Sequence, residues 1–181
     1  EATEIIVSAE SSGKILSLSI HEGDEVRKDQ VLGQIDSTQL FLNKLQVEAS
    51  KMALLSGRPD VESQLDAIRT EIEKAEFEKK RIQKLLESDV ATQKQLDDIN
   101  AQIEVLKANL KAKKTALNIS TEAIDAQSKA LDAQINVIND QLERSTITSP
   151  IDGTVLVKYA EEGEMTSMGK PLFQVADLNR M

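Results

Sequence analysis

Few side chains in this 181-residue sequence have the type and spacing that catalysis requires. The sequence contains no cysteine, which excludes disulfides, thiolate metal sites and a cysteine nucleophile. Its single histidine, His21, has no second ligand at a metal-binding spacing. Glu161, Glu162 and Glu164 cluster beside a glycine, but carboxylates act as an acid–base pair only where a cleft separates their pKa values. With no phosphate-binding loop or nucleophile elbow either, we expect no catalytic residue, no metal site and no cofactor.

Composition excludes further classes of function. The formal net charge is −9, which would repel nucleic acid. Aromatic residues make up only 2% of the chain, so helix packing is a better use of its 40% hydrophobic residues than a large conventional core. No apolar run is long enough to span a bilayer, and no signal peptide is present. The sequence starts without Met and ends without an obvious terminus, which we interpret as a fragment of a longer protein.

A short module occurs twice in the sequence. This repeat predicts the secondary-structure elements that would position any functional residue. Residues 9–36 align with residues 149–176 without a gap. The glycines of the two copies coincide, as Gly13 with Gly153 and Gly23 with Gly163. A repeat unit that cannot bury its apolar face alone must pair with its copy. We therefore expect strands within residues 5–36 to interleave with strands within 146–176 in one small β-barrel or sandwich, with the glycines at its structural turns.

Between the copies the apolar period changes to that of a coiled coil. One column recurs at every seventh residue: Leu96, Ile103, Leu110, Leu117, Ile124, Leu131 and Ile138. We expect the second seam to turn polar at Lys113, Ser120 and Gln127. The preceding segment supplies Val61, Leu65, Ile68, Ile72, Ala75, Ile82 and Leu86, and before it Leu42, Leu45, Ala49 and Met52 form a shorter matching piece. Two helices that leave and return to one place predict a long antiparallel hairpin.

Two breaks divide the helical segment. Gly57-Arg58-Pro59 must kink or interrupt its first half, because proline removes an amide and restricts the residue before it. The heptads lapse at Ser88–Thr92, where we place the turn, and Thr92 can cap the returning helix. Two helical arms of about 50 residues would project roughly 75 Å.

The repeat copies resemble the two halves of a lipoyl domain. The cues are the run from Gly13 to Asp36 and the segment Ser149-Pro-Ile-Asp-Gly-Thr-Val155. Carriers of this type modify a lysine at the junction of the halves, where this chain instead has its helical insert, and the nearest basic residue, Lys44, should be helical. A lipoyl fold split by a helical hairpin resembles the membrane fusion proteins, the HlyD-like periplasmic adaptors of bacterial efflux and secretion pumps.

The resemblance implies an α+β fold, a split lipoyl-like β-sandwich or barrel with a long antiparallel coiled-coil α-hairpin inserted between its halves. The expected domains are 1–36, the first half of the lipoyl-like domain; 37–145, the hairpin, with its tip near 87–92; 146–177, the second half; and 178–181, the start of a link to a β-barrel domain that is absent here. The implied location is the periplasm, with anchoring to the inner membrane through segments absent from this chain.

The resemblance also implies partners. Such adaptors form rings, often hexamers, that bridge an inner-membrane transporter to an outer-membrane channel, and the long hairpin favours an ABC-type transporter over a proton-driven one. Many carry a tip motif R-x₃-L-x₆-S, which Arg81 and Leu85 match and in which Thr92 replaces serine. The implied channel contacts are therefore Arg81, Leu85, Thr92, Asp89, Val90 and Ala91.

Two alternatives belong to other classes. A lipoyl or biotin-type carrier domain of a multienzyme complex would need a modifiable lysine at the junction of the halves. A purely structural coiled-coil tether would need no lipoyl-like base, and the repeat around Gly13 and Gly153 argues against it.

Overall fold

The computed structural model describes residues 3–177, and the expected link at 178–181 lies outside the described residues. Eight strands flank three helices in the order β1–β4, α1–α3, β5–β8. The chain forms two compact units, one of residues 1–51 with 131–181 and the other of residues 52–130. Each unit is described by itself.

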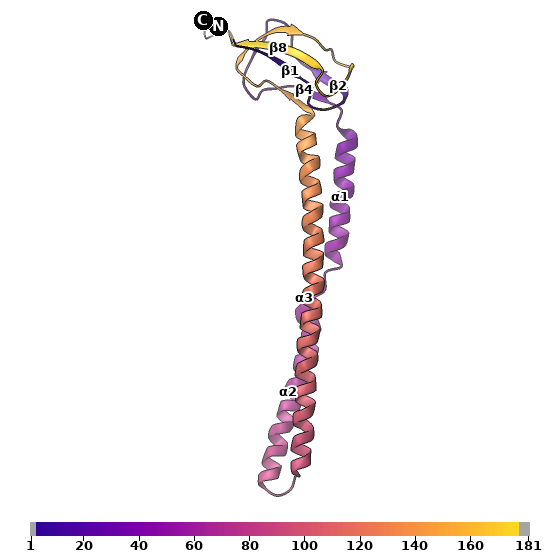
Figure 1. Ribbon diagram of the computed structural model, residues 1–181, viewed down its shortest axis with the longest axis vertical. Coiled ribbons are helices and arrows are strands. Elements are labelled where there is room, and N and C mark those ends of the chain that lie inside the picture. Colours follow the sequence, from indigo (N-terminus) through magenta and orange to yellow (C-terminus); the bar gives the residue numbers. More distant parts are fainter. Residues whose placement is uncertain (1–2, 178–181) are drawn as a thin grey trace. The chain divides into compact units, whose positions relative to one another are not determined.

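The β-strands of the first unit form two four-stranded sheets, drawn with their helical stems in Figure 1. One sheet has the order β1-β8-β6-β3 and the other β5-β4-β2-β7. Each sheet thus draws two strands from the segment before the helices and two from the segment after them, as the predicted interleaving requires. The strands are β1 (Thr3–Ser8), β2 (Gly13–Leu18), β3 (Glu25–Val26), β4 (Val31–Ile35), β5 (Thr146–Thr148), β6 (Gly153–Lys158), β7 (Met165–Thr166) and β8 (Pro171–Asp177).

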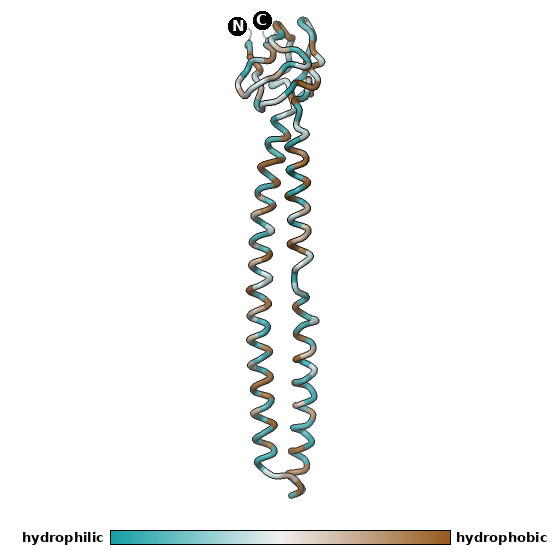
Figure 2. Tube along the Cα trace, turned by 90° about the vertical axis from the view of Figure 1, so that its right-hand side faces the viewer, coloured by the Kyte–Doolittle hydropathy of each residue, from teal (hydrophilic) through white to brown (hydrophobic). Residues whose placement is uncertain are grey.

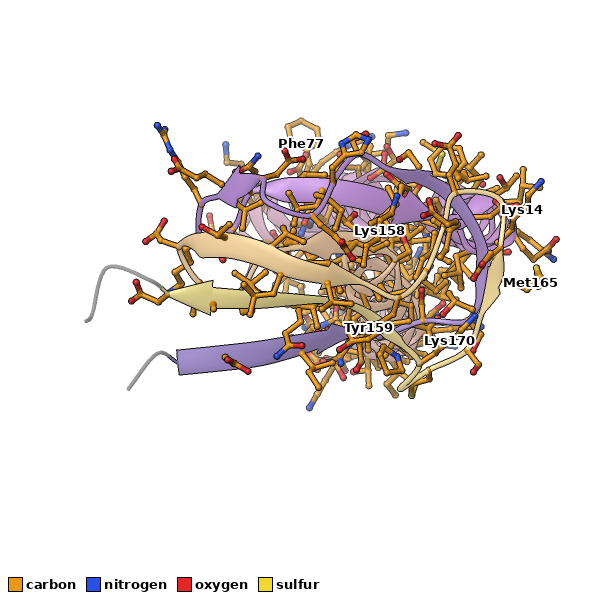
Figure 3. The ribbon with its side chains drawn as sticks, turned by 90° about the horizontal axis from the view of Figure 1, so that it is seen from above. Lys14, Phe77, Lys158, Tyr159, Met165 and Lys170 are labelled. Atoms are coloured by element: carbon orange, nitrogen blue, oxygen red, sulfur yellow. The ribbon has the colours of Figure 1, made fainter. Side chains whose placement is uncertain are left out.

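A pseudo-two-fold relation between the copies extends to individual hydrogen bonds. The Gly23 amide donates to the Val155 carbonyl at 2.8 Å, and the equivalent Gly163 amide donates to the Ile15 carbonyl at 2.8 Å. The strand pairs follow the same exchange: β3 pairs with β6, and β7 pairs with β2. In Figure 3, Lys14 and Met165, which face each other in the β2–β7 pair, lie together at one edge of the domain. Neither copy can therefore complete its sheets without the other.

Glycine is required where the copies turn and where they cross. Gly23 and Gly163 take φ values of 94° and 89°, in the left-handed region that side chains disfavour, and both lie in turns. Gly13 and Gly153, also expected at turns, are instead the first residues of β2 and β6. At Gly153 the limit is space, because a Cβ there would overlap the carbonyl oxygen of Ala176. The core between the sheets buries aliphatic residues of both copies and one aromatic ring: Ala9, Ile15, Leu18, Ile20, Val26, Leu32, Ile35, Ile147, Val155, Ala160, Leu172, Phe173 and Val175.

Helix α1 (Thr38–Ser56) follows β4 after two residues, of which Asp36 holds the first helical residue by hydrogen bonds. The Asp36 side chain accepts hydrogen bonds from the Thr38 amide at 3.0 Å and the Thr38 hydroxyl at 2.7 Å. These bonds, the amide's foremost, lower the pKa of Asp36. Along the helix, the Lys51 ammonium lies 2.6 Å from the Asp132 carboxylate of α3.

The expected seam of α1 is wrong. Leu42, Leu45, Ala49 and Met52 are all exposed, whereas Val47 is buried and Leu40 and Leu54 are half-buried. The helix carries two apolar stripes, and the stripe of Leu40, Val47 and Leu54 is the one that turns inward. The sequence spacing alone does not distinguish them.

Helix α2 (Val61–Glu87) starts after the expected break at Gly57-Arg58-Pro59. Asp60 is its N-cap and accepts hydrogen bonds from the Ser63 amide at 3.2 Å and the Ser63 hydroxyl at 2.6 Å. The interruption thus ends one helix and supplies the cap of the next, and an ion pair between Arg58 and Asp125, at 3.1 Å, ties it to α3.

Helix α3 (Gln93–Arg144) returns along α2, and Figure 2 shows hydrophobic positions recurring along both helices. Their shared core contains buried Ala75, Ile99 and Ile103, with half-buried Ile82, Leu96 and Leu106 packed against it. The predicted antiparallel pairing of the heptads is confirmed here. Lys107 and Glu76 add an ion pair at 3.2 Å across the two helices.

The seven-residue column of α3 is buried or half-buried throughout, but the three residues of the expected polar seam are not. Lys113, Ser120 and Gln127 are exposed, while Thr121 is half-buried and Ser128 is buried. Lys114 is exposed as well, so the second seam lapses around Lys113 and resumes one residue later only at Thr121 and Ser128. The Thr121 hydroxyl donates to the Leu117 carbonyl at 2.9 Å, which satisfies it inside the seam.

Candidate partner-binding site

The end of α2 is closed by hydrogen bonds that fix the path of the turn. The Asp89 amide donates to the Leu86 carbonyl at 3.1 Å, and the Val90 amide donates to the Leu85 carbonyl at 2.9 Å. Asp89 has φ of 55°, the left-handed conformation that this type of helix end requires. The turn is therefore built as a defined structure that holds Val90 beyond the helix.

The start of α3 is closed just as completely. The Thr92 hydroxyl accepts a hydrogen bond from the Gln95 amide at 3.4 Å, and the Gln95 side-chain oxygen accepts one from the Thr92 amide at 2.8 Å. This reciprocal arrangement is a capping box, with glutamine at the third helical position. The Thr92 hydroxyl is thus used in folding, as the predicted cap.

The side chains around this turn are largely open to solvent. Val90 is 72% exposed and Leu85 37%, while Ser88 and Asp89 are exposed and Ala91 is half-buried. Large apolar side chains left exposed beside one another are typical of interaction surfaces. Figure 2 shows the hydrophobic segment at the end of the turn.

Arg81 lies one helical turn before Leu85, on the same face of α2. Its side chain is 67% exposed, and its one ion pair among the described residues is with Glu78, at 3.6 Å. That contact leaves most of the guanidinium's donors available to a partner. The structure therefore places Arg81 and Leu85 side by side along the helix. A backbone hydrogen bond links Leu85 to Val90, whereas the Thr92 side chain is engaged in capping α3.

Sequence reasoning missed the groove on this face of α2. Its volume is about 660 Å³, and its lining includes Phe77, Lys80 and Lys84 in addition to Arg81 and Leu85. Phe77 is 73% exposed. The signal was present in the spacing, because Phe77, Arg81 and Leu85 recur at every fourth residue, but the heptad pattern of the buried seam obscured it.

The described residues contain no group of three or more His, Cys, Asp or Glu side chains placed to hold a metal ion. Within the same part of the chain, no helix has the length and hydrophobicity needed to cross a membrane. Lys44, the lysine nearest to the junction of the copies, lies on α1 with its ammonium 3.9 Å from the Glu48 carboxylate.

Comparisons with known proteins agree on one family. Residues 3–178 match the family model described as the RND MFP barrel-sandwich hybrid domain. In sequence, the chain is 39% identical over 66 residues to the macrolide export protein MacA of Escherichia coli O157:H7, an alignment that covers 36% of this chain and 18% of that protein. The chain thus matches less than a fifth of the length of this curated relative.

Two solved structures share the fold. Crystalline MacA from Actinobacillus actinomycetemcomitans is 27% identical, with a TM-score of 0.55, and the match covers 98% of this chain and 51% of that one. The periplasmic adaptor protein EmrA gives a TM-score of 0.58 at 15% identity, covering 97% of this chain and 72% of that one, and so supports the fold alone. With the family model matching nearly the whole sequence, the chain belongs to the membrane fusion protein family, through its barrel-sandwich hybrid domain.

Proposed function

We propose that this chain is part of a periplasmic adaptor in an efflux or secretion pump, which bridges an inner-membrane transporter to an outer-membrane channel. The observation that carries the proposal is the capped, solvent-exposed turn between α2 and α3, on a helical pair inserted between the halves of a family-matched β domain. The similarity to a macrolide export protein supports export as the process.

The channel contact in this proposal is the turn and the last helical turns of α2. Arg81 offers a planar fork of donors that can bond a partner's carbonyls or carboxylates at two points. Leu85 and Val90 offer apolar surface beside it, and arginine is enriched among interface residues whose truncation is costly. Asp89, Val90 and Ala91 complete the contact, and Thr92 supports it mainly by holding the turn.

The proposed assembly is a ring, a hexamer in the full-length adaptor, with an ABC-type exporter as the inner-membrane partner. The support for the transporter class is the length of the helical insert, in which α3 alone has 52 residues. Affinity purification of the adaptor from membranes of the native host, followed by mass spectrometry, tests this. Co-purification of an ATPase-containing exporter is expected, and a proton-driven pump in its place would reverse the class assignment.

Transport by tip variants tests the function itself. We expect Arg81→Ala/Leu85→Ala to abolish most export in the native host, while circular dichroism shows unchanged helicity. Arg81→Lys should also fail substantially, because it keeps the charge but loses the fork. Lys74→Ala is the matched control, since Lys74 is an exposed cation on the same helix, two turns earlier. Normal export by the folded double variant would refute the proposed contact.

A further inference from the structure

The outer face of α2 before the turn presents a stripe of two apolar side chains and one arginine that nothing in its own unit covers. Phe77 is 73% exposed and Leu85 37%, with the largely exposed Arg81 between them. Residues four apart on a helix are neighbours, so the three side chains form one continuous stripe. The buried stripe of the same helix, with Ala75 and Ile82, faces α3. The Phe77 stripe therefore remains exposed after the helical pair has formed.

A basic rim borders this stripe. The groove of about 660 Å³ is lined by Lys80, Arg81 and Lys84, with Glu87 as its one acidic residue. Among the described residues, Lys80 and Lys84 form no ion pair, and Arg81 has only the exposed contact with Glu78 at 3.6 Å. From Lys79 to Lys84 the sequence contains four cations and no acid, in a chain of net charge −9. The groove is a local basic site on an acidic protein.

We infer that this groove binds an acidic amphipathic helix of the outer-membrane partner, an inference that rests on the proposed function. The partner helix seats an apolar side chain against Phe77 and Leu85 and places carboxylates opposite Lys80, Arg81 and Lys84. Charge complementarity of this kind steers association and fixes register. The docking surface thus extends from the turn along the side of α2, with Phe77 as its apolar anchor.

Two other anionic occupants fit the groove less well. A nucleic acid would meet Glu73, Glu76 and Glu78 directly before the basic run, and these carboxylates would repel its phosphates, while a net charge of −9 opposes binding of a long polyanion. A lipid surface favours a helix with a broad, free apolar face, whereas the other apolar face of α2 is already buried against α3. A helix lying in a surface groove, with its side-chain ridges between those of α2, meets neither difficulty.

Binding to a defined probe gives the first test. A fluorescent 18-residue peptide designed as a helix, with leucines on one face flanked by glutamates, is titrated by fluorescence polarisation. Its twin carries lysine at each glutamate position, and vesicles of phosphatidylglycerol serve as the lipid probe. We expect the acidic peptide to bind, and the lysine twin and the vesicles not to. Equal binding of both peptides, or preferential binding of the vesicles, would overturn the inference.

Variants assign the binding to the groove. Phe77→Ala and Lys80→Glu/Lys84→Glu should each weaken the acidic peptide about tenfold or more. Added salt should reduce the loss of peptide affinity in Lys80→Glu/Lys84→Glu more than the loss in Phe77→Ala, because salt screens charges. Matched controls on α3 are Val105→Ala, an apolar residue 60% exposed, and Lys111→Glu/Lys114→Glu, both exposed. Equal losses in the control variants would overturn the assignment to the groove.

Crosslinking in the native host identifies the occupant. A photo-reactive phenylalanine analogue at position 77 should link to an acidic helical segment of the channel, identified by mass spectrometry, whereas the same analogue at position 105 should not. Linkage to lipid, to another copy of this chain or to nothing would refute the inference.

Export separates the inference from the proposed function. If the groove variants export normally while Arg81→Ala/Leu85→Ala does not, the groove fails and the tip contact stands. If the tip variant exports normally, the proposed function fails, and peptide binding and crosslinking decide the groove independently. Loss of export in both sets, with helicity and the control variants unaffected, supports both.

Discussion

At the scale of single residues, Thr92 connects the folding of the turn with its proposed contact. Its hydroxyl accepts the Gln95 amide while its own amide donates to the Gln95 side chain. A residue at position 92 that also contacts a partner must cap α3 and bond to the partner at the same time. The serine of the family motif and the threonine of this chain both satisfy the first condition, so the added methyl group leaves the cap intact.

We predict that Thr92→Ala lowers the free energy of unfolding of the helical pair by about 1 kcal/mol, because the first turn of α3 loses its cap. Thr92→Ser should leave stability nearly unchanged, since serine caps as well as threonine. Urea unfolding followed by circular dichroism measures both. Equal stability of the alanine and serine variants would show that the Gln95 half of the capping box holds the turn alone.

The sequence indicated only part of this candidate site. Arg81, Leu85 and Thr92 were predicted from the tip motif of the family that the sequence resembles, and Thr92 also from its capping chemistry. Phe77 was missed, because its exposure depends on how α2 is rotated about its axis. The seam with Ala75 and Ile82, which packs against α3, was predicted, but the spacing of Phe77, Arg81 and Leu85 on the exposed face was not followed.

At the scale of elements, the strong heptad periodicity of α3 predicted its buried face correctly. The weaker periodicity of α1 led to the wrong face being predicted as buried. The column from Leu96 to Ile138 was correct because seven consecutive heptads leave one consistent face. In α1 the stripe with Leu42 and Leu45 competes with the stripe of Leu40 and Val47, and only the second is buried. The longer strands were predicted well because β2 and β4 of the first copy recur as β6 and β8 of the second.

The N-cap of α2 gives a pH-dependent prediction. Hydrogen bonds from the Ser63 hydroxyl and then the Ser63 amide lower the pKa of Asp60 below its ordinary value of 3.8. A carboxyl group whose pKa is lower in the folded than in the unfolded state stabilises the fold at pH values above its unfolded-state pKa. That contribution is lost as the pH falls through the folded-state pKa. The stabilisation by Asp60 should therefore be complete near neutrality and disappear in the acid range below pH 3.8.

Asparagine caps helices without titrating in this range, so Asp60→Asn is the matched variant. Thermal melts followed by circular dichroism should show that Tm falls further on acidification in the wild type than in Asp60→Asn. Asp60→Ala should be less stable than both near neutrality. Comparing the change in Tm on acidification between the wild type and Asp60→Asn cancels the contribution of the other carboxyl groups. The same change in both proteins would contradict the role given to Asp60.

At the scale of the whole molecule, the exchange of strands explains why a long insert is tolerated. The Gly23–Val155 and Gly163–Ile15 hydrogen bonds join residues from opposite ends of the chain. Closure of the β domain therefore fixes the two ends of the helical segment close together, whatever its length. The repeat in the sequence made the closeness of the two ends predictable, since two half-modules with open sheet edges must pair with one another.

Self-association is the remaining property of the whole molecule that the surface can predict. Phe41, Leu42 and Leu45 form an exposed apolar face on α1, which favours contact between copies. The net charge of −9 opposes that contact. We expect repulsion to prevail for this chain alone, so that sedimentation velocity at micromolar concentration shows mainly monomer at low ionic strength.

Salt should change that balance, because it screens charge while leaving apolar attraction in place. At about 1 M sodium chloride, where the screening length falls to about 3 Å, we expect a growing fraction of oligomer. Leu42→Ser/Leu45→Ser should suppress it, while Val105→Ser, on α3, should not. A stable hexamer of the unmodified chain at low salt would refute the expectation and place the energy of ring assembly within these 181 residues. A salt response that is the same in both variants would instead show that the contact between copies does not use the exposed face of α1.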